Sequence, residues 1–231
     1  MFIRIRAVVV LSIFALVMCS FSAGQDSSSK VQVFGGYSFQ RVDDGLDGTL
    51  LDPVFGTTSG TFRGPSRFNG LDTQIQYNAN RILGFAADFG GNFGNLFNTV
   101  SGRGVSGLPS ASSISFLVGP VVSTHSKHST LFLHGLVGLN RLHSSSTTTL
   151  TGTKFAALPS DSDTTFAMAL GGGVDYDANH HFSVRLGQFD YLYTAHNMDV
   201  FANKLFGAGT FNDLAAHQDN LRFASGVVFH F

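Results

Sequence analysis

The sequence predicts an all-β fold, an eight-stranded antiparallel transmembrane β-barrel with meander topology, and three observations support this prediction. Apolar and polar residues alternate with a period of two in eight stretches of about ten residues, as in the strands of membrane barrels. Charged residues make up only 13% of the 231 residues, about half the share of a typical soluble domain. Short and long connections alternate strictly, which is typical of short periplasmic turns and long extracellular loops.

Residues 1–24 are predicted to be a secretory signal peptide, so that residues 25–231 form the outer-membrane β-barrel. Two arginines precede an apolar run, and the run ends in small residues that favour cleavage near Gly24. A retained membrane anchor is the weaker alternative, because no basic stop-transfer flank follows the run. Cys19, the only cysteine, raises the alternative of a lipoprotein, but the bulky Met18 precedes it. We expect Cys19 to leave with the signal, so neither disulfides nor thiol chemistry stabilise the mature chain.

The first three predicted strands cover residues 31–42, 70–78 and 82–91, and each sets one face of bulky residues against another that is mostly small or polar. The bulky faces hold Val31, Val33, Tyr37, Phe39, Leu71, Thr73, Ile75, Tyr77, Leu83, Phe85, Ala87 and Phe89. The opposite faces hold Gln32, Phe34, Ser38, Gln40, Asp72, Gln74, Gln76, Gly84, Ala86 and Asp88. This alternation indicates strands with a different environment on each side.

The next three predicted strands cover residues 112–123, 130–141 and 164–176. The fourth strand is nearly apolar, so the direction in which its side chains face is ambiguous. In the fifth and sixth strands the bulky faces hold Leu131, Leu133, Val137, Leu139, Phe166, Met168, Leu170, Val174 and Tyr176. The opposite faces hold Phe132, His134, Gly138, Asn140, Ala167, Ala169, Gly171, Gly173 and Asp175. The sixth strand shows the clearest contrast of all.

The last two predicted strands cover residues 181–194 and 221–231. In the seventh, Phe182, Val184 and Leu186 alternate with Ser183 and Arg185. Its alternation slips near Gly187, which indicates a β-bulge or a kink. In the eighth, one face holds Leu221, Phe223, Ser225, Val227, Phe229 and Phe231. We expect this closing strand to pair with the first strand and complete the ring.

The connections between these strands fall into two classes. Three are tight turns that carry Asn, Asp or Ser, at residues 78–81, 125–128 and 177–180. Four are long and rich in Gly, Ser, Thr, Asn and Asp, at about residues 43–69, 92–111, 143–163 and 195–217. An even number of strands places both termini on the short-turn side, which is consistent with export from within the cell.

A membrane barrel explains the two faces better than a soluble sandwich or a lipocalin-like barrel, which is the alternative fold. The polar face carries too little charge for a solvated surface, and small residues such as Gly171 and Ala224 suit a narrow interior. Backbone N–H and C=O groups in lipid must be paired within the protein, so an open sheet edge is excluded there. We therefore expect bulky side chains to face acyl chains, and small and hydrophilic side chains to fill the interior.

Five segments also resemble a known family. VQVFGGYSF, NGLDTQIQYN, ADFGGNF, LGGGVDY and FASGVVFHF are similar to the outer-membrane β-barrel domain family, the OmpA/OmpX-like eight-stranded proteins of Gram-negative envelopes. The resemblance covers the whole mature chain. It implies a location in the bacterial outer membrane, contact with outer-membrane lipid and recognition by the barrel-assembly machinery during biogenesis.

The resemblance also concerns the end of the chain. It implies that the last strand carries a C-terminal assembly signal, formed by Phe223, Val227, Phe229 and Phe231. Full-length OmpA-type proteins add a peptidoglycan-binding domain after the barrel, whereas this sequence stops at Phe231, so that anchoring role is not carried over.

Polar residues on the inward face are predicted to form a network in the lumen. They are Asp72, Gln74, Gln76, Asp88, His134, Asp175, Arg185, Asn220 and Arg222. Asp190 joins them if the slip at Gly187 changes which residues of its strand face the interior. An isolated charge in a narrow lumen is costly, so we expect the two arginines to pair with the aspartates. A plug that fixes strand register is favoured over a gated or narrow ion pathway, because eight-stranded barrels leave little open space.

Signals for other chemistry are weak. The nine histidines show no metal-ligand spacing and the glycine clusters no phosphate-binding motif, so no metal or cofactor is expected. A formal charge of −1 gives no basic footprint for nucleic acid. The candidates for catalysis near the outer rim are His143, Ser144, His196 and His217. Nothing in the sequence sets a serine beside a base and an orienting acid, which nucleophilic catalysis requires.

These observations predict a non-enzymatic integral outer-membrane protein with a structural or surface-interaction role. It would display four mobile loops, whose binding partner the sequence does not indicate. The first alternative is a narrow porin-like channel for small solutes. The second is an outer-membrane enzyme that modifies lipid A.

Overall fold

The structure is a computed structural model that describes residues 30–43, 48–51, 58–63, 66–95, 99–102, 105–106, 110–145, 149–150, 161–196 and 217–231. The predicted signal peptide lies outside these residues. The regular elements in the described ranges are all β-strands. No helix in this part of the chain is long and apolar enough to cross a membrane.

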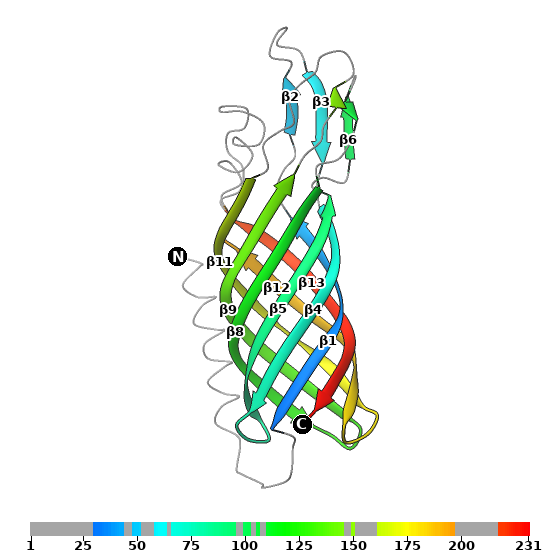
Figure 1. The fold of residues 1–231 in the computed structure, drawn as a ribbon, viewed down its shortest axis with the longest axis vertical. Helices are drawn as coiled ribbons and strands as arrows, with labels where there is room; N and C mark the ends of the chain where they lie inside the picture. The colour runs from blue at the N-terminus through cyan, green and yellow to red at the C-terminus, as the bar shows by residue number, and fades with distance from the viewer. Residues whose placement is uncertain are drawn as a thin grey trace, which may run out of the picture.

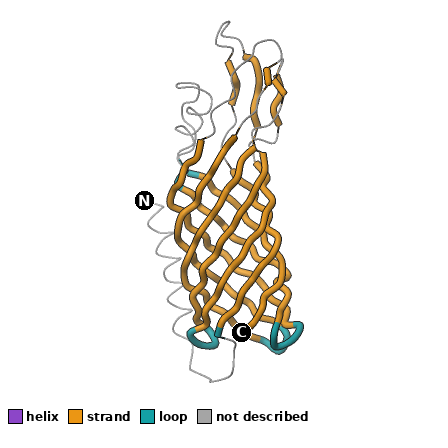
Figure 2. Tube along the Cα trace, viewed as in Figure 1, coloured by secondary structure: helices purple, strands orange, loops and turns teal. Residues whose placement is uncertain are grey.

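Eight long strands form a closed antiparallel barrel (Figures 1 and 2). Their bounds are β1 Val31–Asp43, β4 Ser66–Asn78, β5 Leu83–Asn95, β8 Ser110–His125, β9 Ser129–Ser145, β11 Asp161–Asp177, β12 Phe182–Thr194 and β13 Gln218–His230. The order around the ring is β1-β13-β12-β11-β9-β8-β5-β4, so successive barrel strands pair and the last returns to the first. The predicted eight-stranded meander barrel is confirmed.

The ring closes along β1 and β13, as predicted. Val33 is the Cα partner of Phe229, and Phe39 is the partner of Phe223. The N–H of Phe231 donates to the carbonyl oxygen of Val31 at 2.8 Å, so the pairing continues to the last residue. The barrel wall therefore has no open edge, as a sheet in lipid requires.

Asparagine side chains shape two of the three tight turns. The Oδ1 of Asn80 accepts the backbone N–H groups of Ile82 and Leu83 at 2.9 and 2.8 Å. The Oδ1 of Asn179 accepts those of His181 and Phe182 at 2.8 and 3.0 Å. These bonds pair backbone donors that the strand ladder leaves unpaired at its end, which is why Asn favours such turns.

The slip expected near Gly187 is a register shift in β12. The pairing of β12 with β13 shifts between Arg185 and Gln188. Arg185 faces the lumen before the shift, and Gln188 and Asp190 face it afterwards. Because the shift changes the parity of the strand, it turns Asp190 inward.

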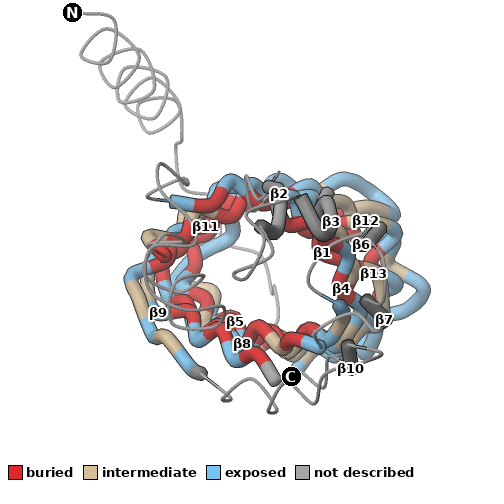
Figure 3. Tube along the Cα trace, turned by 90° about the horizontal axis from the view of Figure 1, so that it is seen from above, coloured by how far each residue is buried: buried red, intermediate tan, exposed pale blue. Residues whose placement is uncertain are grey.

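The outer face of the barrel wall is apolar, as predicted. Exposed side chains such as Leu71, Phe89 and Leu133 cover the outer face. Seen along the barrel, buried and exposed residues alternate along the strands (Figure 3). In β8, whose facing was ambiguous, Phe116 points outward and Leu117 inward.

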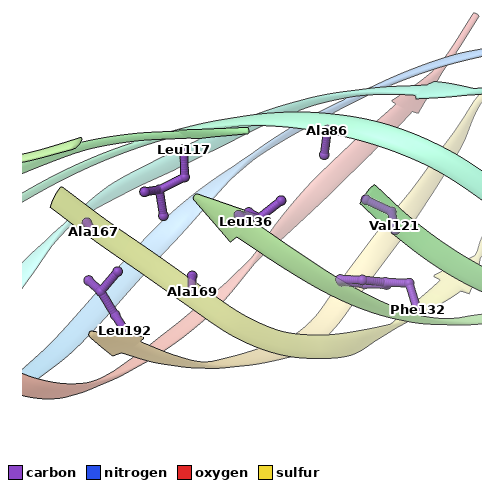
Figure 4. Packing of buried hydrophobic residues seen from close by; sticks show 8 residues of the cluster. All are labelled: Ala86, Leu117, Val121, Phe132, Leu136, Ala167, Ala169 and Leu192. Atoms are coloured by element: carbon purple, nitrogen blue, oxygen red, sulfur yellow. The ribbon is translucent and has the colours of Figure 1, made fainter. Parts of the chain in front are cut away.

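The interior differs from the sequence-based expectation that small and hydrophilic side chains fill it. A buried apolar cluster is formed by Ala86, Leu117, Val121, Phe132, Leu136, Ala167, Ala169 and Leu192 (Figure 4). Leu117 and Leu136 are both fully buried. Apolar side chains fill a narrow interior without needing hydrogen-bond partners, which polar side chains would require.

Within the described residues, five shorter strands lie in the long connections, and the alternation of apolar and polar residues did not predict them. They are β2 Gly48–Leu51, β3 Thr58–Arg63, β6 Thr99–Gly102, β7 Val105–Ser106 and β10 Thr149–Leu150. The strands β2, β3 and β6 extend beyond the end of the barrel that lies opposite the C-terminus (Figure 1). Because β3 pairs with β6 and β7 pairs with β10, backbone hydrogen bonds join three of the long connections to one another.

Candidate functional site in the barrel lumen

Arg222 on β13 is the centre of the polar lumen. Its Nη1 and Nη2 donate to the two carboxylate oxygens of Asp88 at 2.8 and 3.2 Å. Its Nε and Nη2 donate to Oδ2 of Asp190 at 2.9 and 2.7 Å. Its Nη1 also lies 3.5 Å from Oδ1 of Asp72. One guanidinium group therefore links carboxylates from β4, β5 and β12 across the barrel.

Arg185 on β12 forms a second centre. Its Nε and Nη2 donate to both oxygens of Asp175 at 2.8 and 3.1 Å, a bidentate pair. Its Nη1 donates to the side-chain oxygen of Gln74 at 3.1 Å. The guanidinium carbon lies 4.3 Å from the ring centre of Phe34 and 4.2 Å from that of Phe132. These two cation–π contacts fix the cation between two aromatic faces.

Gln188 joins the two centres into one network. Its Oε1 accepts from Nη1 of Arg185 at 2.6 Å, and its Nε2 donates to Oδ2 of Asp190 at 2.8 Å. The remaining oxygen of Asp190 lies 2.8 Å from Nε2 of His134. Gln188 was not among the predicted lumen residues, although its place one residue after the slip at Gly187 gave a signal that it faces inward.

The other predicted lumen residues lie inside the barrel but outside the two centres. Gln76 is buried and donates to Oδ1 of Asn78 at 2.7 Å, next to a tight turn. Asn220 is buried and its Nδ2 lies 3.4 Å from Oγ1 of Thr194. The structure therefore brings together eight of the ten predicted lumen residues and places Gln76 and Asn220 apart.

Two inward glycines leave room for the charged groups. A Cβ atom added at Gly171 would lie 2.1 Å from Oδ1 of Asp190. A Cβ atom added at Gly90 would lie 3.1 Å from Nη1 of Arg222. The small residues of the inward face thus provide the space that the network occupies.

The network contains more carboxylates than guanidinium groups. The carboxylates belong to Asp72, Asp88, Asp175 and Asp190, and the guanidinium groups to Arg185 and Arg222. Asp72 is the least well paired of them, because its Oδ2 has no hydrogen-bond partner among the described residues. The described network therefore carries a formal excess of negative charge.

A separate polar cluster follows the end of β12. Nδ1 of His196 lies 2.9 Å from Oδ2 of Asp163, and Nε2 lies 3.0 Å from Oδ1 of Asn140. Asn140 in turn donates to Oγ of Ser113 at 2.9 Å. Burial lowers the pKa of His196, and the nearby Asp163 carboxylate opposes that shift only in part.

The four candidates for catalysis are not assembled into one site. Ser144 is buried, and no hydrogen bond among the described residues connects its hydroxyl to a histidine. His196 contacts an aspartate and an amide, while His217 stacks on Tyr193 with 5.4 Å between ring centres. Within the described ranges, no group of three or more His, Cys, Asp and Glu side chains could hold a metal ion.

The described geometry can be compared with known proteins. A family model described as "Outer membrane protein beta-barrel domain" matches residues 11–229. The chain belongs to this family. It is therefore a β-barrel of the bacterial outer membrane, and the predicted family and location are confirmed.

Several solved structures are similar to this chain, and the first named here supports the fold. The crystal structure of Neisserial surface protein A is similar with a TM-score of 0.55 and 14% identity, covering 89% of this chain and 100% of that one. Ail, the attachment invasion locus protein of Yersinia pestis, gives a TM-score of 0.47 and 15% identity over 88% of this chain and 100% of its own. OprG from Pseudomonas aeruginosa gives 0.49 and 12%, covering 88% and 96%. A search of the curated proteins finds no match.

Membership of this family sets the surroundings of the network. The strands of an outer-membrane barrel cross hydrocarbon, so lipid encloses the barrel wall and the wall encloses the charges. Inside such a wall, ionic hydrogen bonds are strong and unpaired charges are costly. The arrangement can therefore hold the strands in register and occupy the lumen.

The outward side chains of β13 suit contact with lipid. Phe229 and Phe231 are 51% and 72% exposed, and Phe223 lies 5.0 Å from Phe189, ring centre to ring centre. Val227 also lies on this face. The role of Phe223, Val227 and Phe229 in β13, and of Phe231 directly after it, as a signal for the barrel-assembly machinery stays a prediction.

Proposed function

We propose that this outer-membrane barrel does not conduct solutes, and that it has a structural and surface-interaction role. The observation that carries the proposal is the continuous ionic network from Arg185 through Gln188 and Asp190 to Arg222. Its members come from strands on several sides of the barrel, so the network spans the lumen. An eight-stranded barrel has an interior just wide enough for side chains, so a filled cross-section leaves no path.

The strength of the network supports a closed lumen. Opening a path requires breaking several hydrogen bonds between charged groups, each of which contributes about 1.5–3 kcal/mol. The freed charges would then need water within a wall surrounded by lipid. The apolar cluster around Leu117 and Leu136 adds buried surface that does not attract that water.

The short strands beyond the barrel support the surface-interaction part of the proposal. Loops of outer-membrane barrels lie outside the cell, and here β3 pairs with β6 and β7 with β10. Pairing between loops lowers the conformational entropy that a partner would otherwise have to remove on binding. The outer end of the barrel would thus offer a partly ordered surface.

Conductance in planar bilayers tests the closed lumen. The refolded full barrel should give no conductance steps, while a large open porin added under the same conditions as a positive control should give them. Heat-modifiable migration on a detergent gel checks that the barrel used is folded. Regular conductance steps from folded protein would overturn the proposal.

Labelling of intact cells tests the display of the loops. A cysteine placed by Thr61→Cys in β3 should react with a membrane-impermeant maleimide on intact cells. The matched variant Ala79→Cys, in a tight turn, should react only after the outer membrane is permeabilised. The opposite pattern would contradict the proposed orientation.

A narrow cation pathway is the second candidate, and the excess of carboxylates favours it. Asp72, which faces Arg222 at 3.5 Å and has an oxygen without a partner in the described residues, is the group that a cation would meet. Cation-selective conductance that disappears in Asp72→Asn would support this candidate. The proposal assigns no catalysis to the barrel, and an unchanged lipid-A mass spectrum after expression is the expected result.

A further inference from the structure

Two arginines face each other on the outer surface of the barrel. Arg41 lies two residues before the end of β1, Arg67 is the second residue of β4, and the strand register makes them direct Cα partners. Both side chains are exposed. On the same face, two steps of the pleat towards the middle of the barrel, lie the apolar side chains of Tyr37 and Leu71.

A direct cross-strand pair of like charges is destabilising unless something compensates it. Opposite residues on one face of an antiparallel pair have Cβ atoms about 4.5–5.5 Å apart, so two guanidinium groups there repel one another. The outer cross-strand partners on the other sides are Leu221 for Arg41 and Asn95 for Arg67. Neither of these partners carries a charge.

Two acidic residues border this face: Asp43 follows Arg41 by two residues on β1, and its Cα partner is Asp219 on β13. The carboxylate of Asp219 is already engaged. Asp219 lies one pleat step from Leu221 on β13, and its Oδ1 accepts the hydroxyl of Tyr191 at 2.5 Å. Its other oxygen lies 3.7 Å from Nε2 of His217. Among the residues whose side chains the structure describes, which leave out Asp43, no salt bridge joins a carboxylate to Arg41 or Arg67.

The depth of the pair indicates what compensates its charge. The arginines lie at the loop end of the barrel, which in this family faces the cell exterior, just beyond the apolar belt. Arginine buries its aliphatic stem against such a belt and keeps its charged head at the level of the lipid headgroups. The planar guanidinium fork matches phosphate oxygens with two parallel hydrogen bonds.

We propose that Arg41 and Arg67 together bind one phosphate group of a phosphorylated glycolipid in the outer leaflet. A dianionic phosphate between the two forks would convert the repulsive pair into two attractive ones. Asn95 adds an exposed amide beside Arg67, which can donate to a further oxygen of the headgroup. The inference depends on the outer-membrane location and not on whether the lumen conducts.

A third outward arginine supplies a matched comparison. Arg141 on β9 has Ile114 and Thr164 as its cross-strand partners, and its Nη2 donates to Oγ of Ser162 at 3.3 Å. It is exposed at the same end of the barrel but faces no like charge. Replacing Arg141 therefore removes one surface charge without disturbing the arginine pair.

Native mass spectrometry of the refolded full barrel tests the site, with lipid A and dephosphorylated lipid A as probes. The wild type should bind phosphorylated lipid A at least about tenfold more tightly than the dephosphorylated form, the factor that corresponds to 1.4 kcal/mol. The double variant Arg41→Gln/Arg67→Gln should lose this preference, and Arg141→Gln should keep it. Equal binding of both lipids by the wild type would overturn the proposal, as would an unchanged preference in the double variant.

Three more measurements distinguish a lipid site from a free-anion site and from a pair that Asp219 organises. Inorganic phosphate at millimolar concentration should not displace lipid A, and displacement would show a free-anion site instead of a lipid site. Asp219→Asn should leave the preference unchanged, whereas a loss would mean that this carboxylate organises the arginines. If the double glutamine variant does not fold, the lysine pair Arg41→Lys/Arg67→Lys keeps the charges but not the forks. That pair should bind lipid A more weakly than the wild type, and equal binding would overturn the bidentate site.

Discussion

Arginine occurs on both faces of the barrel wall, and the two faces compensate its charge in different ways. Inside, Arg222 is fully buried and forms hydrogen bonds at 2.8 and 2.7 Å to carboxylates of Asp88 and Asp190. Outside, Arg41 and Arg67 face each other with no carboxylate of the described residues in contact. Among the described side chains, the chain thus supplies counter-ions to the inner arginines and none to the outer pair.

The difference follows from what each face can reach. The lumen is closed to lipid and too narrow for bulk water, so a charge there must be paired by another strand. The outer rim meets headgroups and solvent, which can approach and leave. The inner arginines should therefore determine stability, whereas the outer arginines should determine which lipid is bound.

Removal of the inner cation should give the largest effect. Arg222→Leu leaves the carboxylates of Asp88 and Asp190 buried without their counter-ion, and breaking a buried pair in this way costs about 3–5 kcal/mol. Urea unfolding of the barrel in lipid vesicles measures this loss of free energy of unfolding. The exposed Arg141→Leu is the control and should change the free energy of unfolding by less than about 0.5 kcal/mol.

The carboxylates provide a further check of the same prediction. In the background of Arg222→Leu, Asp88→Asn and Asp190→Asn should restore part of the lost stability, because each removes an unpaired buried charge. A loss below about 1 kcal/mol for Arg222→Leu alone would mean that water enters the lumen and solvates the charges.

An arginine introduced on the outer face should lower the free energy of unfolding by an amount that depends on its depth in the bilayer. Phe89 is the seventh of the 13 residues of β5, whereas Phe85 is only the third, and both are exposed to the outside. Phe89→Arg should cost about 2–4 kcal/mol, the range for arginine at the bilayer midplane, and Phe85→Arg about 1 kcal/mol or less. Urea unfolding in vesicles compares the two variants, and equal costs would contradict the lipid-facing assignment.

The alternation between an apolar and a polar face made the strands predictable, but it did not predict well where each strand begins and ends. The fold follows from alternation in the lipid-facing part, where the outer side chains must be apolar. At the rim this requirement ends, and the start of β4 shows the reverse order: Arg67 and Asn69 point outward while Phe68 is fully buried. The predicted strand 70–78 therefore began four residues later than β4, which begins at Ser66.

The sequence predicted which polar residues line the lumen, but not which of them contact one another. Parity alone selected Asp88 and Arg222 as inward residues. Their contact joins residues 134 positions apart, and it depends on the register of every strand between them. The nearly apolar β8 remained ambiguous because it faces lipid on one side and an apolar cluster on the other, so neither face is polar.

The smallest expected effect on the free energy of unfolding concerns the loop end of the lumen. The buried basic residue there is His196 and not an arginine. Burial lowers the pKa of His196 from its ordinary value of 6.5, so the unfolded chain binds this proton more tightly than the folded barrel. The stability that neutral His196 contributes is therefore complete above pH 6.5 and is lost as the pH falls below it.

The loss should be measurable as a difference between the wild type and His196→Gln. The free energy of unfolding in urea should fall between pH 7.5 and pH 5.5 by a larger amount in the wild type, with a limit of about 1.4 kcal/mol per pH unit for one proton. Asp163, whose Oδ2 lies 2.9 Å from Nδ1 of His196, opposes the shift, so Asp163→Asn should steepen the pH dependence. A carboxylate at the loop end of β11 would then moderate a buried histidine, whereas the carboxylates deeper in the lumen balance a permanent cation. An identical pH profile for the wild type and His196→Gln would remove this contrast between the two ends of the interior.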